Sequence, residues 1–142
     1  IGSTDFIFPV RGQVIATKPM STTSLIFPKS ITLNDGYEYL IQRRSDGRII
    51  FGGFRWRSES PTKEVGVFDD STVDPTVGSE LREYLPWFFD GAFKSETIEV
   101  EYEWTGVMGY TADSRPLIGP LRRRCCRFSF LKTAILLHVN YP

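Results

Sequence analysis

The sequence has few of the residues on which nucleophilic and metal chemistry depend. It contains one histidine, His138, and two cysteines, the adjacent pair Cys125 and Cys126. A Ser-His-Asp triad requires a positioned histidine base, and a zinc site requires spaced pairs of ligands, so neither is predicted. Adjacent cysteines rarely bridge each other, so no disulfide framework is predicted and an intracellular, reducing compartment is favoured.

Long apolar runs, a net charge and a nucleotide-binding loop are also missing. Lysine plus arginine and aspartate plus glutamate both number 17, so the formal net charge is zero, and no nucleic-acid or membrane-surface role is predicted. The best apolar run, Thr133–Val139, is too short to span a bilayer. No Gly-x-Gly-x-x-Gly or Walker loop occurs among the 142 residues, so they encode no self-contained dinucleotide cradle.

The composition is nevertheless that of a folded domain with one clear helix. Hydrophobic residues make up 41% of the chain and aromatic residues 14%. Asp74-Pro75 is a helix start, with aspartate as N-cap and proline in the first turn. One apolar stripe follows, made of Val77, Leu81, Tyr84, Leu85 and Phe88. Pro86 is predicted to end or kink this helix near Leu85.

A β-hairpin is predicted from two apolar segments, Tyr37–Arg44 and Arg48–Trp56. Asp46-Gly47 between them is the preferred pair for a type I′ turn, which would place Tyr39 opposite Phe54. In this register Gly52-Gly53 leaves a gap in an otherwise bulky sheet. The gap admits a ligand in one reading, and marks a β-bulge or close packing on a helix in the other.

Two further strands are predicted. Val10–Met20 contains Arg11-Gly12-Gln13, where the glycine marks either a close approach by another backbone or ligand, or a bulge with a solvated arginine. Glu96–Pro120 alternates strictly up to Thr105, which predicts a buried face with Ile98, Val100, Tyr102 and Trp104. The glutamates at 99, 101 and 103 would form a solvated face opposite Arg43, Arg44 or Arg55, and Gly106 and Gly109 would break the strand.

The order of these elements predicts an α+β fold, with a mixed, largely antiparallel sheet covered on one face by the helix. Residues 1–120 would form this domain. Residues 121–142 differ in kind, with four arginines and no turn signals or clean period, and are interpreted as an atypical tail that a frameshift or intron could produce.

Three motifs in order resemble those of a known enzyme family. They are Arg11-Gly12-Gln13, the hairpin from Tyr39 to Gly53 and Asp113 with Arg115-Pro116-Leu117-Ile118-Gly119. Together, over Val10 to Pro120, they resemble the FAD-dependent oxidoreductases of the D-amino-acid oxidase, glycine oxidase and sarcosine oxidase group. The resemblance implies the substrate domain of such an enzyme, without its FAD-binding Rossmann half.

The resemblance also implies site residues and a chemistry. Arg11, Gly12, Gln13, Pro116 and Gly119 would lie at the cofactor. Substrate would be contacted by Tyr39, Gly53, Met108 and Tyr110. The reaction would be hydride transfer from a carbon bearing an amine to the flavin, with a small amine or amino acid as substrate.

Departures from the family pattern leave two hypotheses open. The D-amino-acid and glycine oxidases place a carboxylate-binding arginine where this chain has Met108. Either the substrate is a different amine, or Arg55 or Arg57 takes that role. The missing FAD fingerprint and the chain start at Ile1 suggest a fragment that needs its FAD-binding half as partner. The alternative is a catalytically inactive truncated chain that acts at most as a binding module.

Overall fold

The computed structural model describes residues 7–20, 27–89, 98–113 and 115. Five strands and one α-helix form its framework, together with two single 3-10 turns. In chain order the elements are β1 (Ile7–Thr17), β2 (Ile31–Leu33), η2 (Asn34–Gly36), β3 (Glu38–Gln42), β4 (Ile49–Gly52), η3 (Arg55–Arg57), α1 (Pro75–Phe88) and β5 (Val100–Thr111).

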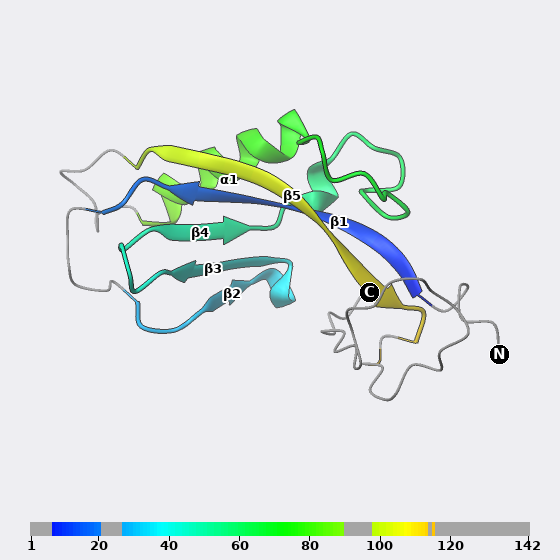
Figure 1. The fold of residues 1–142 in the computed structure, drawn as a ribbon, viewed down its shortest axis with the longest axis horizontal. Coiled ribbons are helices and arrows are strands. Elements are labelled where there is room, and N and C mark those ends of the chain that lie inside the picture. Colours follow the sequence, from blue (N-terminus) through cyan, green and yellow to red (C-terminus); the bar gives the residue numbers. More distant parts are fainter. Residues whose placement is uncertain (1–6, 21–26, 90–97, 114, 116–142) are drawn as a thin grey trace, which may run out of the picture.

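The strands form one sheet in the order β2-β3-β4-β1-β5, and α1 covers one of its faces (Figure 1). Each neighbouring pair is antiparallel. β1 and β5 pair along almost their whole length and continue past the other strands as a two-stranded ribbon. The predicted α+β architecture with a helix on one face is confirmed, and no parallel pair occurs among the described strands.

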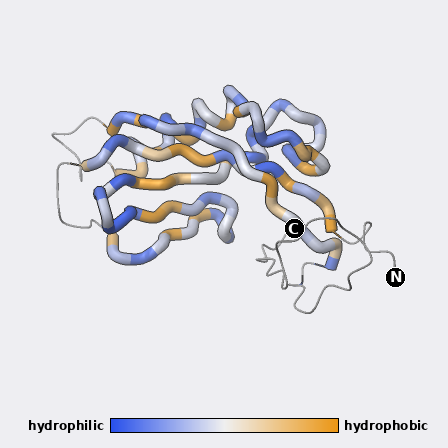
Figure 2. Tube along the Cα trace, viewed as in Figure 1, coloured by the Kyte–Doolittle hydropathy of each residue, from blue (hydrophilic) through white to orange (hydrophobic). Residues whose placement is uncertain are grey.

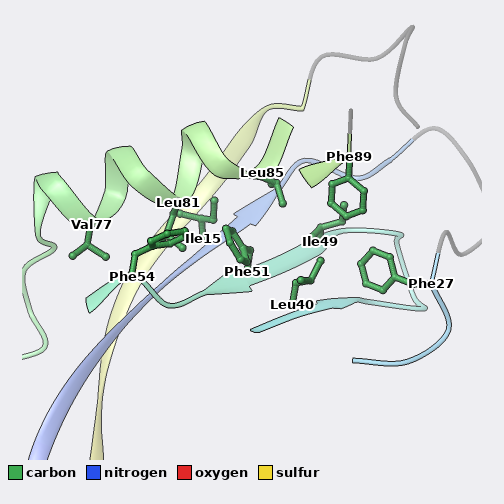
Figure 3. Close-up of a cluster of buried hydrophobic side chains, with 10 residues drawn as sticks. All are labelled: Ile15, Phe27, Leu40, Ile49, Phe51, Phe54, Val77, Leu81, Leu85 and Phe89. Carbon is green, nitrogen blue, oxygen red and sulfur yellow. The ribbon is translucent and has the colours of Figure 1, made fainter. Parts of the chain in front are cut away.

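The hydrophobic core lies between the sheet and α1 (Figure 3). Ile15, Leu40 and Phe51 point from three adjacent strands toward Leu81 and other helix residues, and the central strands are correspondingly apolar (Figure 2). Complete burial of such a side chain contributes about 1.5–3 kcal/mol, so this layer holds the helix on the sheet. The full core cluster is Ile15, Phe27, Leu40, Ile49, Phe51, Phe54, Val77, Leu81, Leu85 and Phe89.

Helix α1 begins as predicted and extends further than predicted. The Asp74 carboxylate accepts hydrogen bonds from the backbone N–H groups of Thr76 (2.9 Å) and Val77 (3.1 Å), as an N-cap does. Pro86 lies inside the helix, which does not end near Leu85. The Phe89 N–H donates to the Leu85 carbonyl at 3.4 Å, so the last turn closes beyond the proline.

The hairpin is present, but its predicted turn and register are wrong. Only Gly47 of the predicted Asp46-Gly47 pair has a positive φ, whereas a type I′ turn needs two such residues. Arg43 and Arg48 pair across a four-residue loop, so Tyr39 lies opposite Gly52 and not Phe54. The register differs by two residues, which changes the cross-strand partners and keeps each side chain on its predicted face.

The prediction for the last strand is confirmed at Ile98 and Val100, which pack against the core, and wrong for its break and for the burial of Tyr102 and Trp104. β5 continues through Gly106 and Gly109, because both pair with β1. Tyr102 and Trp104 are 55% and 43% exposed, whereas Glu103 lies under α1. Partners across the fold explain this orientation, since Glu103 is bonded to Arg82 and Gln13.

The other two glutamates of this strand also have partners that the sequence did not predict. Glu99 pairs with Lys18, and Glu101 pairs with Arg48. β1 likewise has no bulge at Arg11-Gly12-Gln13; its pairing with β5 shifts only between Ala16 and Thr17.

The hairpin turn predicts an acid-sensitive part of the stability. Arg43 and Arg48 both bond the Asp46 carboxylate, and the hydrogen bond from Arg43 is the main cause that lowers its pKa from 3.8 to about 2. A carboxyl with a lowered folded-state pKa stabilises the fold above its unfolded pKa and loses that effect as pH falls. The difference in unfolding free energy between wild type and Asp46→Asn should therefore be largest above pH 3.8 and shrink toward about pH 2.

Urea denaturation across this pH range measures the difference. Asp35→Asn, in the turn before β3, is the matched control for loss of one carboxylate. If the difference in unfolding free energy between wild type and Asp46→Asn does not change with pH, the carboxyl of Asp46 does not have a lowered pKa in the folded protein.

Candidate functional site

The face of the sheet opposite α1 carries exposed aromatic and aliphatic side chains, and we call it the open face. Strand register places Tyr39, Gly52, Val14 and Trp104 in one row across it. Its exposed members include Tyr39, Ile41, Tyr102 and Trp104. This face therefore offers a broad aromatic surface that no described element covers.

Tyr39 lies on Gly52 at the middle of the open face. A Cβ atom built on Gly52 would come within 2.6 Å of Tyr39 Cζ and 2.7 Å of its hydroxyl oxygen. Only glycine leaves room for the ring in this position. The gap predicted from Gly52-Gly53 is therefore present in the backbone, and it is filled by the Tyr39 ring.

The packing of Tyr39 affects its acidity. Burial of the phenol raises the pKa of Tyr39 above 10.0, and the nearby Tyr110 raises it further. The side chain remains 37% exposed, so its hydroxyl is both near solvent and firmly protonated at neutral pH. The two residues that interact in this way are both among the predicted substrate residues.

Met108 and Gly12 form a second pair of this kind on the β1–β5 ribbon. A Cβ atom on Gly12 would lie 2.8 Å from the terminal methyl carbon of Met108. Met108 pairs with Val10, the same-face neighbour of Gly12. The predicted substrate residue Met108 thus covers the glycine of the predicted cofactor tripeptide.

The chain leaves β4 through two consecutive residues in left-handed conformations. Gly53 has φ +136° and Phe54 has φ +57°. The Gly53 N–H donates to the Gln13 carbonyl at 3.3 Å, which fixes the kink beside β1. A positive φ is strained for phenylalanine and persists here because its ring is buried in the core.

The kink is followed by Arg55, which lies between two tyrosines. Its guanidinium carbon is 5.9 Å from the Tyr37 ring centroid and 6.0 Å from that of Tyr110. Its Nη1 donates to the Lys63 carbonyl at 3.4 Å, and the residue is 8% exposed. Arg57 is placed differently, because it pairs with Glu80 of α1 and stacks on Trp56.

Two residues of the predicted cofactor tripeptide point away from the open face. Arg11 pairs with Glu64, and its Nη1 donates to the Asp69 carbonyl (2.9 Å) and to Thr72. The Gln13 amide exchanges hydrogen bonds with the Asp74 backbone, at 2.7 and 3.0 Å. Their side chains fasten the loop before α1 to β1, so Gly12 is the residue of this tripeptide that lies on the side of the open face.

The structure places Met108 on Gly12, with Tyr110 two residues further along β5, and it places Tyr39 on Gly52. Gly53 adjoins β1 through the hydrogen bond from its N–H to the Gln13 carbonyl. The prediction that Tyr39, Gly53, Met108 and Tyr110 bind substrate stays a prediction, as does the role of the tripeptide. Outside the described residues lie Pro116, Gly119, the 121–142 tail and the 120/121 boundary.

Sequence reasoning missed the exposure of Trp104 and the strained backbone at Phe54. The Gly52-Gly53 pair before Phe54 was the one signal in the sequence that could have indicated this strain.

Two kinds of site are not found in the described part of the chain. No group of three or more histidine, cysteine, aspartate or glutamate residues there is arranged to hold a metal ion. Within the same ranges, no helix has the length and hydrophobicity needed to cross a membrane.

Comparison with protein families decides the membership of the chain. Residues 2–132 match the family described as DAO, FAD dependent oxidoreductase. This chain belongs to that family. Comparison with the curated proteins gives no match.

Family membership implies FAD, and the described residues suit one part of this cofactor. The open face carries the exposed aromatic rings of Tyr39 and Trp104 in one row, and aromatic rings suit stacking on the planar isoalloxazine ring. The pyrophosphate normally lies on a glycine-rich turn at a helix N-terminus. The N-terminus of α1 does not provide this in the described structure, because the Asp74 carboxylate already caps it.

The contact between Gly52 and Tyr39 leads to a second prediction. Gly52→Ala should push the Tyr39 ring off the sheet into solvent and return its pKa toward 10.0, because burial is the main cause of the raised value. Gly106→Ala is the matched control, since a Cβ atom there meets nothing within 4 Å.

The measurement is a spectrophotometric titration of phenolate absorbance, with Tyr39→Phe identifying the signal of Tyr39. A Gly52→Ala protein in which Tyr39 titrates as in wild type would show that the ring does not depend on the glycine.

Proposed function

We propose that this chain forms the substrate-facing wall of an FAD-dependent oxidoreductase that oxidises a small amine or amino acid. The observation that carries the proposal is the position of Tyr39 on Gly52 and of Met108 on Gly12, with Tyr110 on the same strand as Met108 and near enough to Tyr39 to affect its pKa. Tyr39 is far in sequence from the two β5 residues, and the fold brings their strands into one sheet. Family membership supplies the redox class, and this surface supplies a place for the substrate.

The bound flavin would accept a hydride from the carbon that bears the amine. The residues of this chain would bind and orient that carbon. The Tyr39 hydroxyl, kept protonated by its raised pKa, is suited to donate a hydrogen bond to a polar group of the substrate. Met108 offers a flexible apolar contact beside it, which helps to exclude water from the reacting carbon.

The dinucleotide part of FAD requires residues that these 142 do not supply in recognisable form. We therefore propose an FAD-binding half of Rossmann type as the partner of the open face. Exposed Ile41, Tyr102 and Trp104 support a large apolar partner surface, because such patches mark interaction sites. We also propose an intracellular location, on the basis of the cysteine usage alone.

A second candidate function is favoured by the same exposed surface. An inactive truncated chain would retain the open face and could bind a partner without catalysis. The two functions differ in flavin content: the enzyme purifies with FAD, whereas the inactive chain does not.

The first test is the flavin content of the native protein. The protein that carries this sequence, isolated from its source cells with an antibody to the chain, should be yellow with about one FAD per chain. Its flavin should be bleached by a small amine or amino acid in the absence of oxygen. Native protein without flavin absorbance would reject the enzyme and leave the binding module.

Tyr39→Phe tests the proposed role of the hydroxyl. Loss of one neutral hydrogen bond costs about 0.5–1.5 kcal/mol, so KM should rise about two- to tenfold with little change in kcat. Tyr102→Phe removes a hydroxyl from another tyrosine of the open face and is the matched control. Steady-state kinetics of the flavin-containing protein measure both, and equal effects of the two variants would exclude a specific role for Tyr39.

A further inference from the structure

We propose that the outer edge of β5 pairs with the same edge of a second copy of this chain, so that two sheets join into one across a twofold axis at Gly106. The strand order β2-β3-β4-β1-β5 places β5 last, and within the described ranges no strand pairs with its outer side (Figure 1). The inference goes beyond the proposed function and does not depend on it, because strand pairing uses only the backbone and the side chains of β5.

The two outermost strands of the sheet differ in length and in protection. β2 has three residues and runs directly into η2, and such short edge strands are one way in which proteins prevent further pairing. β5 has 12 residues, contains no proline or lysine, and pairs with β1 without a register shift from Tyr102 to Thr111. A long and regular edge of this kind is a template on which another strand can pair.

The apolar side chains of β5 are the second support. The large ones that are 37–55% exposed are Tyr102, Trp104, Val107 and Met108. Trp104 and Met108 lie on the open face, and Val107 lies on the opposite face, so apolar surface flanks the edge on both sides of the sheet. Exposed apolar surface that is concentrated on one strand indicates an interaction site.

The charges of β5 restrict where the axis can lie. Glu101 pairs with Arg48 and Glu103 pairs with Arg82, so both carboxylates already have a counter-charge within their own chain. Like charges directly opposite each other destabilise a strand pair. A register that places Glu103 opposite its own copy, or opposite Glu101, is therefore disfavoured, and the axis lies further along β5.

An axis at Gly106 gives the most complementary register. Residues at equal distances on either side of the axis then face each other on the same side of the joined sheet. Trp104 faces Met108 of the partner subunit on the open face, where a sulfur–aromatic contact is favourable. Glu103 faces Gly109 of the partner subunit, so no two glutamates meet within the paired strands. The joined sheet thus brings Met108, a predicted substrate residue, beside an aromatic residue of the other copy.

The first test is the mass of the full protein in solution, measured by light scattering after size-exclusion chromatography. Wild type should have the mass of two chains. Val107→Glu should raise the dissociation constant at least about tenfold, because the two new carboxylates lie diagonally across the axis from each other. Ile41→Glu changes an exposed aliphatic residue of β3 and is the matched control, which should leave the dimer intact.

Two results of this measurement would overturn the proposal. One is a wild-type protein with the mass of one chain. The other is a dimer that Val107→Glu leaves unchanged, because its interface would then lie elsewhere on the molecule. The mass reports assembly whether or not the protein contains flavin, so this proposal and the proposed function can fail separately.

A second test maps the register with single cysteines, in a full protein that carries Cys125→Ser and Cys126→Ser. A Cβ atom at Gly106 meets nothing within 4 Å, so Gly106→Cys fits the fold. With oxidised glutathione it should form a disulfide between two copies, because opposed Cα atoms lie about 4.5–5.5 Å apart. Gly109→Cys would face a glutamate of the other copy and should form far less.

Electrophoresis without reducing agent measures the disulfide-linked dimer in both cysteine variants. A linked dimer that forms mainly with Gly106→Cys supports the axis. Absence of linkage at Gly106, or linkage at Gly109 that equals or exceeds it, would overturn the proposal even if Val107→Glu failed to fold.

Discussion

The arrangement of the fold depends on the hydrogen bonds of one side chain, Gln13. Its amide nitrogen donates to the Asp74 carbonyl and to Glu103, and its amide oxygen accepts from the Asp74 N–H. These bonds join β1 and β5 to the N-terminus of α1 in a buried layer, where a lost partner would cost about 1–3 kcal/mol. They fix which face of the sheet the helix covers, and they leave the aromatic row through Tyr39 and Trp104 on the other face.

The same bonds explain where sequence reasoning succeeded and where it failed. The cap at Asp74 and the apolar stripe are local signals, and both occur as predicted. The alternation in β5 was also read correctly as a strand, but hydrophobicity alone assigned its faces, and the assignment holds at Val100 and fails at Tyr102 and Trp104. Glu103 lies inward because Arg82 and Gln13 reach it from elements far away in the sequence, which no local period reveals.

The prediction of the hairpin from sequence was also only partly correct. Asp46-Gly47 indicated a turn, yet the arginines on either side bond the Asp46 carboxylate and accompany a longer loop with a different register. The candidate site was more predictable from motif resemblance than from pattern. Resemblance named Tyr39, Met108 and Tyr110, and the structure shows that Gly52 makes room for Tyr39 and Gly12 for Met108. It could not show that Arg11 and Gln13 direct their side chains to the opposite side.

Glycine and aromatic residues therefore have complementary roles on the open face. Gly52 and Gly12 lack the Cβ atoms that would displace Tyr39 and Met108, so these side chains lie low against the sheet. This packing leaves exposed aromatic surface against which another ring can stack. The guanidinium of Arg48 lies over the Tyr102 ring of this face and pairs with Glu101, so this charge already has its counter-charge. The kink at Gly53 and Phe54 places Arg55 beside the Tyr110 ring, so the strained backbone also fixes where that cation lies.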